Sequence, residues 1–303
     1  MKPKPPGRCP LDPSRRLDGV DFVAFDFETT GCTASTDAIV EAGAVRFRLG
    51  SDGVPVTLDR FESLVDPGRP IPPEVIRVHG ITDADVAGQP PIADVLPRLE
   101  DFFGDAADTL LMAHNASFDL AFLAAAHDSV GRPRTGHVAI DTVRLSRRLR
   151  PALPGHSLRS LKKSFHVEPS RAHRGLDDAA ALAAIFAGLV TAEGGPSTLA
   201  DLFRLTPPRP IPTRIPTGPF GRSRPAPPPP DDPRVDPTLS AALATRRRVS
   251  FVYDAGSRSG ARRDVTPDRI VHGSTASYLV AFCHRDGVTK QYRLDRIREC
   301  VGG

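Results

Sequence analysis

The sequence predicts two folded parts, an α/β domain built on a mixed sheet with flanking helices and a small all-β domain near the C-terminus. Three observations lead to this prediction. Three strand-like runs in succession are followed by alternating helical and strand-like segments, which is typical of a mixed α/β sheet. A stretch dense in proline then excludes helix and sheet. Short β-like runs separated by glycine-containing turns follow it.

The elements of the first part follow from hydrophobic periodicity and from turn residues. A run rich in Phe and Val that ends at Thr-Thr-Gly predicts a first strand at 22–28. We then expect strands at 39–48, 57–65, 109–113 and 138–141. Helices are expected at 73–78, 92–103, 142–149, 157–165 and 179–192, with one more over the Ala- and Leu-rich run 120–126.

The proline-dense stretch between Thr206 and Asp236 predicts an extended, partly stiff linker. We therefore divide the chain into a basic, proline-rich segment (1–19), an α/β domain (20–193), a linker (194–236) and a tail domain (237–303). In the tail we expect a helix at 238–245 and strand-like runs at 249–253, 263–267, 270–271, 278–282 and 289–294. Their spacing predicts a small barrel of the SH3/Sm-like kind.

Two acids stand inside the first predicted strand. Side chains alternate across a strand, so Asp26 and Glu28 share one face, with their Cβ atoms roughly 7 Å apart. Two like charges on an apolar strand are costly without a counter-charge, and a pair of divalent cations would supply it. The alternative is an edge strand whose acids meet water.

Two further segments place acids at the ends of predicted elements. Asp119 falls in the first turns of a helix that follows a strand, where it could also simply complement the helix dipole. Asp177 and Asp178 precede the Ala- and Leu-rich helix at 179–192, where Asp177 would serve as an N-cap and Asp178 would stay free. His173 lies in the loop before them.

This ordered set resembles the DEDDh 3′–5′ exonuclease family over about residues 20–193. The first motif is matched by Phe25-Asp26-Phe27-Glu28-Thr29-Thr30-Gly31, the second by His114 to Asp119, and the third by His173 to Asp178. The five-residue step in the third motif is typical of the His subclass. The resemblance implies a ribonuclease H-like fold and hydrolysis of phosphodiesters with two divalent cations, Mg²⁺ or Mn²⁺. It makes Asp26, Glu28, Asp119 and Asp178 the metal ligands and His173 the general base.

The same resemblance implies contacts to the substrate. Thr29 and Thr30 would grip the terminal nucleotide, Asn115 and Phe118 would contact the base or support the ligands, and the turn at His79 would pack over the terminal base. Phe118 could equally be a core residue and Thr30 an ordinary turn residue. The expected partner is single-stranded DNA or a DNA 3′ end. An exoribonuclease, and a nucleic-acid-binding regulator that uses the nuclease fold as a scaffold, are the alternatives.

The tail resembles the WYL domain in its helix-led order and in its closing run Tyr292-Arg293-Leu294-Asp295-Arg296-Ile297. One departure is Ser277, which stands where the name-giving Trp would be. The resemblance points to a regulatory tail that binds nucleic acid or a ligand. The candidate residues are Tyr278, Arg262, Arg293 and Arg296. The alternative is that these arginines are solvated or pair with Asp264, Asp268 and Asp295.

Charge and composition bear on the need for metal ions and on the cellular location of the protein. The net charge of +4 divides unevenly, because residues 20–193 hold 17 Lys and Arg against 24 Asp and Glu, a net charge of −7. An acidic domain that cuts a polyanion needs metal ions at its site. No apolar run approaches the ~20 residues of a membrane span. The N-terminus has no apolar core typical of a secretory signal, and the four cysteines show no metal or redox spacing. We expect a cytoplasmic protein with reduced thiols and no membrane partner.

Overall fold

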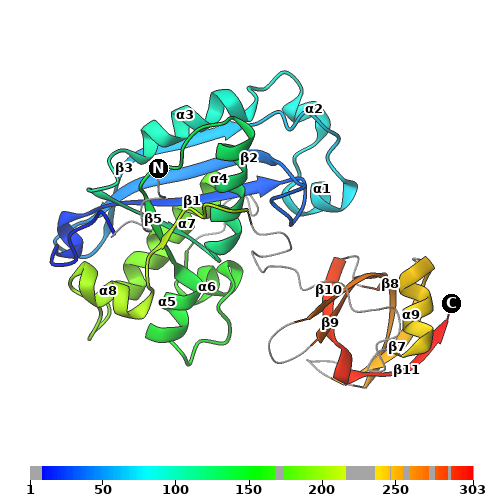
Figure 1. Ribbon diagram of the computed structural model, residues 1–303. Coiled ribbons are helices and arrows are strands. Elements are labelled where there is room, and N and C mark those ends of the chain that lie inside the picture. Colours follow the sequence, from blue (N-terminus) through cyan, green and yellow to red (C-terminus); the bar gives the residue numbers. More distant parts are fainter. Residues whose placement is uncertain are drawn as a thin grey trace, which may run out of the picture. The chain divides into compact units, whose positions relative to one another are not determined.

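The computed structural model describes residues 9–167, 174–215, 236–245, 247–254, 260–272, 277–285 and 288–302. The chain divides into two compact units, Met1–Arg222 and Ser223–Gly303 (Figure 1). The sequence-derived domain boundaries remain a proposal, and each unit is considered by itself below.

The first unit is built on a six-stranded mixed sheet with the strand order β3-β2-β1-β4-β5-β6. β1 pairs antiparallel with β2 and parallel with β4, and β4 pairs parallel with β5, so β1 separates an antiparallel part of the sheet from a parallel part, to which the edge strand β6 adds antiparallel. This is the mixed α/β sheet that the sequence predicts. The strands are β1 (Asp21–Thr29), β2 (Ile39–Leu49), β3 (Pro55–Leu64), β4 (Thr109–Ala113), β5 (Val138–Asp141) and β6 (Arg209–Pro210).

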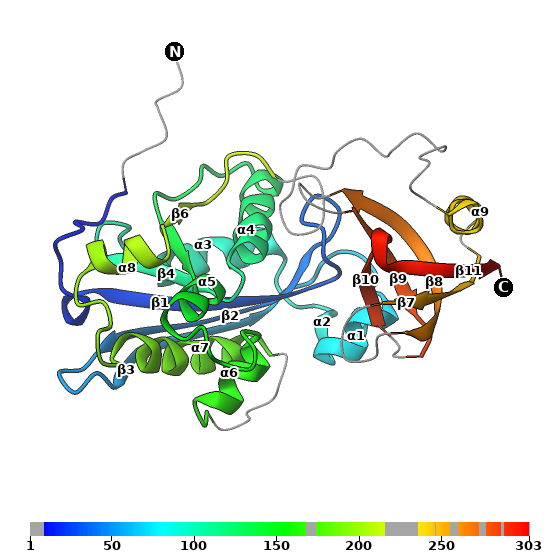
Figure 2. The same ribbon diagram turned by 90° about the horizontal axis from the view of Figure 1, so that it is seen from below.

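Helices cover both faces of this sheet. One core contains side chains of α3 and α4, and a second core contains side chains of α5, α6, α7 and α8. Figure 2 shows α3 and α7 on opposite sides of the sheet. The helices are α1 (Pro73–His79), α2 (Asp83–Val86), α3 (Ile92–Phe103), α4 (Ser117–Ser129), α5 (Thr142–Leu149), α6 (Leu158–Ser164), α7 (Gly175–Val190) and α8 (Leu199–Leu205), and a 3₁₀ turn, η1, covers Leu17–Gly19.

Aromatic packing fixes α7 against the central strands. Phe186 of α7 lies 5.0 Å from Phe22 of β1 and 6.1 Å from Phe47 of β2, measured between ring centroids. All three rings are fully buried. Aromatic residues remove large apolar areas from water and prefer such tilted contacts. The C-terminal half of α7 is therefore held on the sheet, and its first turn is directed toward the middle of β1.

The first turn of α7 approaches the sheet backbone to backbone. A Cβ atom added at Gly43 of β2 would lie 2.0 Å from Gly175 C and Leu176 N. A Cβ atom added at Gly175 would lie 3.0 Å from Asp26 O. The two glycines thus allow a contact that any side chain would block.

The structure corrects the predicted start of the last helix. α7 begins at Gly175, four residues before the predicted start at 179, and its N-cap is Arg174. Asp177 and Asp178 lie in its first turn, so Asp177 is not the N-cap. The cap comes from elsewhere in the chain, because Glu41 Oε2 accepts a hydrogen bond of 2.8 Å from the Gly175 N–H. A long-range cap of this kind leaves no local sequence signal.

Residues outside the predicted bounds 20–193 also belong to the two cores of the first unit. Leu11 and Leu17 are buried on the N-terminal side, and Leu199, Leu202 and Ile211 are buried on the C-terminal side. The two-residue strand β6 pairs with β5 inside the predicted linker. Proline is tolerated there because an edge strand needs few backbone donors. We therefore propose wider bounds, 9–215, for the first domain.

The second unit contains a five-stranded antiparallel sheet with the order β10-β9-β8-β7-β11. Its core includes the mutually packed rings of Phe251, Tyr253 and Tyr292. Two predicted runs, 263–267 and 270–271, form one strand with an irregularity after Pro267. Closure into an SH3/Sm-like barrel stays a prediction. The elements are α9 (Pro237–Thr245), β7 (Val249–Tyr253), β8 (Ala261–His272), β9 (Ser277–Cys283), β10 (Val288–Arg293), the 3₁₀ turn η4 (Leu294–Arg296) and β11 (Ile297–Gly302).

Membrane-spanning helices are absent from the described part of the chain, because no helix there is both long enough and apolar enough to cross a bilayer.

The contact between Gly43 and Gly175 generates a prediction on stability. Gly43→Ala should lower the free energy of unfolding by about 1–3 kcal/mol, because the new methyl group meets backbone atoms that cannot turn aside. Urea unfolding followed by circular dichroism measures the change. Gly19→Ala is the matched control, since a Cβ atom there meets nothing within 4 Å. An unchanged Gly43→Ala transition would mean that α7 can move away from β2 at little cost.

Candidate active site

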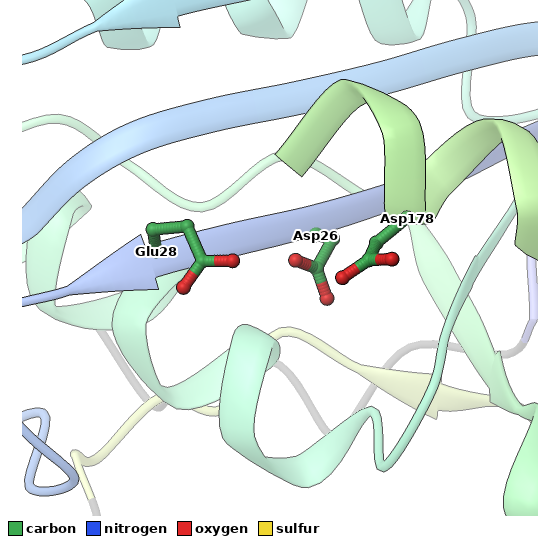
Figure 3. A group of neighbouring side chains, drawn as sticks. All are labelled: Asp26, Glu28 and Asp178. Atoms are coloured by element: carbon green, nitrogen blue, oxygen red, sulfur yellow. The ribbon is translucent and has the colours of Figure 1, made fainter. Parts of the chain in front are cut away.

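Three carboxylates meet where the first turn of α7 crosses β1. Asp26 and Glu28 extend from the same face of β1, as their spacing predicts, and Asp178 comes from α7 (Figure 3). One carboxylate oxygen from each lies within 4.8 Å of the other two. Glu28 and Asp178 keep only 9% and 8% of their surface exposed. Such a set of oxygen atoms could hold a hard divalent cation.

Asp119 lies beside this group. It sits in the first turn of α4 and is 2% exposed. Its Oδ1 accepts a hydrogen bond of 3.2 Å from the N–H of Phe27, the residue between Asp26 and Glu28. Burial raises the pKa of Asp119, and the charge of the Asp26 carboxylate raises it further. The structure therefore brings all four acids that the sequence singled out to one place.

The four acids strain the site electrostatically. Burial, together with the charges of Asp178 and Glu41, raises the pKa of Asp26 to about 8. Burial, together with the charges of Asp26, Asp178 and Glu41, raises the pKa of Glu28 to about 9. These carboxylates are too little exposed for water to screen their charges, so their ionised forms need a positive partner. A bound cation would be such a partner, and it would lower these pKa values again.

Lys162 supplies part of the missing positive charge, and the sequence did not place it beside the acids. Its Nζ forms an ion pair with Asp178 Oδ1, and both side chains are almost buried, at 13% and 11% exposure. The same charge lowers the pKa of Asp26. Lys162 comes from α6, and no periodicity in the sequence indicates that α6 reaches the acids.

Glu41 is a second residue that the sequence reasoning missed. It is fully buried on β2, directly opposite Glu28 in the strand pairing. Its Oε1 accepts hydrogen bonds from Arg174 Nε and Nη2, at 2.8 and 2.6 Å, and its Oε2 accepts one from the Gly175 N–H. Glu41 thus fixes the start of α7, three residues before Asp178. The signal that could have found it is an acid within the apolar run Ile39-Val40-Glu41-Ala42.

The loop after β4 is held by a network of side chains. His114 Nδ1 lies 3.0 Å from Thr142 Oγ1, and its Nε2 lies 3.0 Å from the His156 carbonyl oxygen. Burial is the main cause that lowers the pKa of His114. Asn115 adopts a left-handed backbone with φ of 72° and donates its N–H to Asp141 Oδ1 at 3.3 Å. The predicted substrate residue Asn115 therefore has a fixed backbone position.

The other predicted substrate residues have local roles in this structure. Thr29 Oγ1 donates to the Gly31 carbonyl, and Thr30 Oγ1 accepts from the Ala38 N–H. His79 is buried and its Nδ1 accepts from the Ile81 N–H. Phe118 packs on Phe122, with 4.8 Å between ring centroids. These contacts are structural, and a role of the four residues in substrate binding stays a prediction.

His173, the predicted general base, lies outside the described residues, and Arg174 is the next residue described. Its role therefore stays a prediction.

In the tail, the predicted arginines contact neighbouring groups. Arg262 pairs with Glu299 at 3.3 Å, and Arg293 binds both carboxylate oxygens of Asp295, at 3.0 and 2.7 Å. Arg296 donates to the Asp254 carbonyl at 3.3 Å. Tyr278 is the cross-strand partner of Arg293. The alternative that these arginines pair with Asp264, Asp268 or Asp295 describes Arg293, whereas the partner of Arg262 is Glu299, which the alternative did not include.

Comparisons with known proteins fit this geometry. Residues 23–186 match the RNase_T family, described as Exonuclease, and residues 235–301 match the WYL domain. The chain is 38% identical over 167 residues to a DNA polymerase III of the PolC type from Listeria monocytogenes, and 40% identical over 161 residues to that of Halalkalibacterium halodurans. These matches cover 55% and 53% of this chain, but 11% of each relative.

Among solved structures, the zinc-bound complex of Escherichia coli ExoI with single-stranded DNA superposes with a TM-score of 0.52 at 18% identity. The match covers 87% of this chain and 55% of that one, and at this identity it shows the fold alone. The fold of the first unit is thus the ribonuclease H-like exonuclease fold. By the match over more than half of its length, the chain belongs to the DEDDh 3′–5′ exonuclease family, a family of phosphodiester hydrolases, and it carries a C-terminal WYL domain.

Proposed function

We propose that this protein is a metal-dependent exonuclease that removes nucleotides from DNA 3′ ends, with a preference for single strands. The observation that carries the proposal is the assembly of four carboxylates from β1, α4 and α7 in a nearly buried position, with raised pKa values for Asp26, Glu28 and Asp119. DNA is favoured over RNA because the relatives with 38–40% identity are named DNA polymerase III.

The donor set fits Mg²⁺ or Mn²⁺, since all four candidate ligands are carboxylates and no thiolate or imidazole belongs to the described group. Asp26, Glu28, Asp119 and Asp178 would hold two such ions. When bound, divalent ions stabilise the charge of the phosphodiester under attack and favour ionisation of a water molecule. The Glu41 and Gly43 contacts keep Asp178 at its distance from Asp26 and Glu28.

In this proposal His173 accepts the proton of the attacking water. An imidazole with an ordinary pKa near 6.5 suits this role around neutral pH. Thr29, Thr30, Asn115, Phe118 and His79 would contact the terminal nucleotide, as the family resemblance implies. The scaffold alternative is disfavoured, because a fold kept only for binding has no need of four buried acids that repel one another.

The WYL domain would regulate the exonuclease by binding nucleic acid or a small ligand. Two of the four tail candidates, Tyr278 and Arg293, are cross-strand partners on β9 and β10. Arg262 and Arg296 complete the proposed set.

Digestion of oligonucleotides labelled at either end tests the function. The full-length protein with Mg²⁺ or Mn²⁺ should shorten single-stranded DNA from its 3′ end, faster than RNA and faster than blunt duplex DNA. Asp119→Asn and Asp178→Asn should each reduce the rate by about 10²-fold or more, because each removes a proposed metal ligand. Faster digestion of RNA would favour the exoribonuclease. Wild-type rates in both variants would remove the carboxylates from the mechanism.

The raised pKa values predict a pH dependence of stability for the metal-free protein. In the unfolded chain these acids lose their protons near pH 4, whereas in the folded chain Asp26 and Glu28 keep theirs up to about 8 and about 9. The folded state binds more protons between these limits, so the free energy of unfolding should fall as the pH rises from about 5 to about 8. Chemical unfolding in EDTA measures this slope.

Added Mg²⁺ should restore stability at the upper end of that range, because the ion binds the folded state. Asp26→Asn should flatten the slope in EDTA, whereas Asp94→Asn, at an exposed acid of α3, should leave it unchanged. A slope in Asp26→Asn equal to that of the wild type would show that Asp26 titrates normally.

His173→Ala separates the base from the ligands. Loss of a general base should lower kcat on the order of 10²–10⁴-fold. It should also alter the acidic limb of the pH–rate profile and leave the Mn²⁺ concentration for half-maximal activity unchanged. A higher Mn²⁺ requirement with an unaltered pH profile would instead make His173 a ligand or a structural residue.

Glu41→Gln tests the positioning of Asp178. The amide keeps the shape of the side chain but loses the charge that holds the Arg174 guanidinium. We expect a roughly 10–100-fold loss in metal affinity or kcat, the usual effect of a residue that orients a ligand. Glu62→Gln is the control, because Glu62 contacts the same guanidinium only at 3.4 Å and is more exposed. Equal metal titrations for the wild type and Glu41→Gln would contradict this role.

A further inference from the structure

A cavity of about 720 Å³ lies at the ends of β4 and β5, and none of the four acids lines it. Its wall includes three arginines of α5 and two histidines from the loops after β4 and before α6. These residues are Arg144, Arg147, Arg148, His114 and His156, with Asn115 at the edge. The metal chemistry of the four acids leaves these arginines without a role.

The segment around this cavity is strongly basic within an acidic domain. Residues 142–167 hold seven Lys and Arg and no Asp or Glu, whereas residues 20–193 as a whole carry a net charge of −7. This segment contains α5 and α6 and leads from the cavity to Lys162, which contacts Asp178. This basic segment thus lies next to the four acids.

The three arginines of α5 share one side of the helix. Positions 144, 147 and 148 are spaced i, i+3 and i+4, which places like charges next to one another and destabilises a helix. None of the three has an acidic partner within the described ranges. Elsewhere in the same unit arginines are commonly paired with acids, for example Arg15 with Asp108, Arg132 with Glu100 and Arg174 with Glu41. An anion in the cavity would relieve this repulsion.

The polar wall of the cavity is preorganised. Ser146 Oγ lies 3.0 Å from His156 Nδ1, and the His156 carbonyl oxygen lies 3.0 Å from His114 Nε2. The one acid of the wall, Asp141, is occupied, because its Oδ1 accepts from the backbone N–H groups of Asn115 and Val143. The cavity therefore offers arginine charge beside a fixed polar wall, with little competing negative charge.

The cavity also lies close to the acids. The last pair in the register of β1 and β4 is Ala24 with Met112. Asp26 and His114 each follow two residues later, on β1 and after β4. The charge of Asp178 acts on the His114 imidazole and tends to raise its pKa. A chain of phosphates with one end at the acids could therefore reach the arginines.

We propose that this cavity binds backbone phosphates of the substrate strand on the 5′ side of the bond that is cleaved. Guanidinium groups bind phosphate oxygens through paired N–H donors, which suits a polyanion better than a single small anion. The proposal rests on the proposed nuclease function. It assigns strand affinity to α5 and leaves hydrolysis to the four acids, so the two can be separated by experiment.

The test compares the full-length wild type with the triple variant Arg144→Ala, Arg147→Ala, Arg148→Ala. Binding of a fluorescent single-stranded 12-nucleotide DNA is measured with Ca²⁺ in place of Mg²⁺ at several salt concentrations. Each lost phosphate contact should reduce the slope of log K against log salt by about 0.7, so the triple variant should lose about 2. The affinity advantage of the wild type should then shrink roughly tenfold or more between about 50 and about 200 mM salt.

Hydrolysis of a dinucleotide with Mg²⁺ is the second measurement, because this substrate is too short to reach α5. The triple variant should keep the wild-type kcat on it. The control variant Arg16→Ala, Arg60→Ala, Arg204→Ala removes the same charge from exposed residues outside the cavity and should keep most of the slope. Thermal unfolding of all three proteins confirms that they are folded.

Three outcomes would overturn the proposal. The first is an unchanged salt slope in the triple variant, and the second is an equal loss in the control variant, which would reflect net charge alone. The third is unchanged strand binding with weaker inhibition by a nucleoside monophosphate, which would make the cavity a product site. If the wild type cleaves no oligonucleotide at all, the proposed function fails instead, and the binding measurements still decide the role of α5.

Discussion

Repulsion among nearly buried carboxylates is the constraint on which the rest of the first unit depends. Asp26 and Glu28 could avoid one another only by leaving β1, and Asp178 only by moving the start of α7. The fold therefore has to hold two elements together at the point where their charges push them apart. Burial increases the cost, since it removes the water that would screen the charges.

The structure meets this cost with contacts that lie around the acids. Gly43 and Gly175 let the backbone of α7 touch the sheet, and the aromatic contact of Phe186 with Phe22 anchors the same helix further along. Glu41 caps the helix and binds Arg174, although its own charge adds to the strain on Asp26 and Glu28. A residue that fixes geometry and raises electrostatic cost at once is consistent with a site that is completed by cations.

Acidic and basic residues are concentrated on different elements of the first unit. The acids converge at the middle of β1, while α5 and α6 carry six basic residues and no acid, and Lys162 of α6 contacts Asp178. In the proposed function, a polyanionic substrate would meet attraction beside a site that would otherwise repel it. The local pairing of Arg262 and Arg293 in the second unit contrasts with Arg144, Arg147 and Arg148 of α5, which have no acidic partner among the described residues.

The sequence by itself determined the order of the elements and the identity of the four acids. The period of 2 in β1 placed Asp26 and Glu28 on one face, and the bounds of α3, β4, β5 and α5 agree with those expected from pattern alone. These features depend on residues that are close to one another in the sequence, so the sequence alone is enough to predict them.

Tertiary structure alone decided what depends on residues far apart in the chain. The start of α7 is set by Glu41, 134 positions away from Gly175, so the N-cap expected at Asp177 was wrong. Lys162 reaches Asp178 only because α6 packs beside α7, and α8 and β6 join the first unit through buried side chains and an edge pairing. The raised pKa values follow from burial and from charges of other elements, and neither quantity exists until the chain has folded.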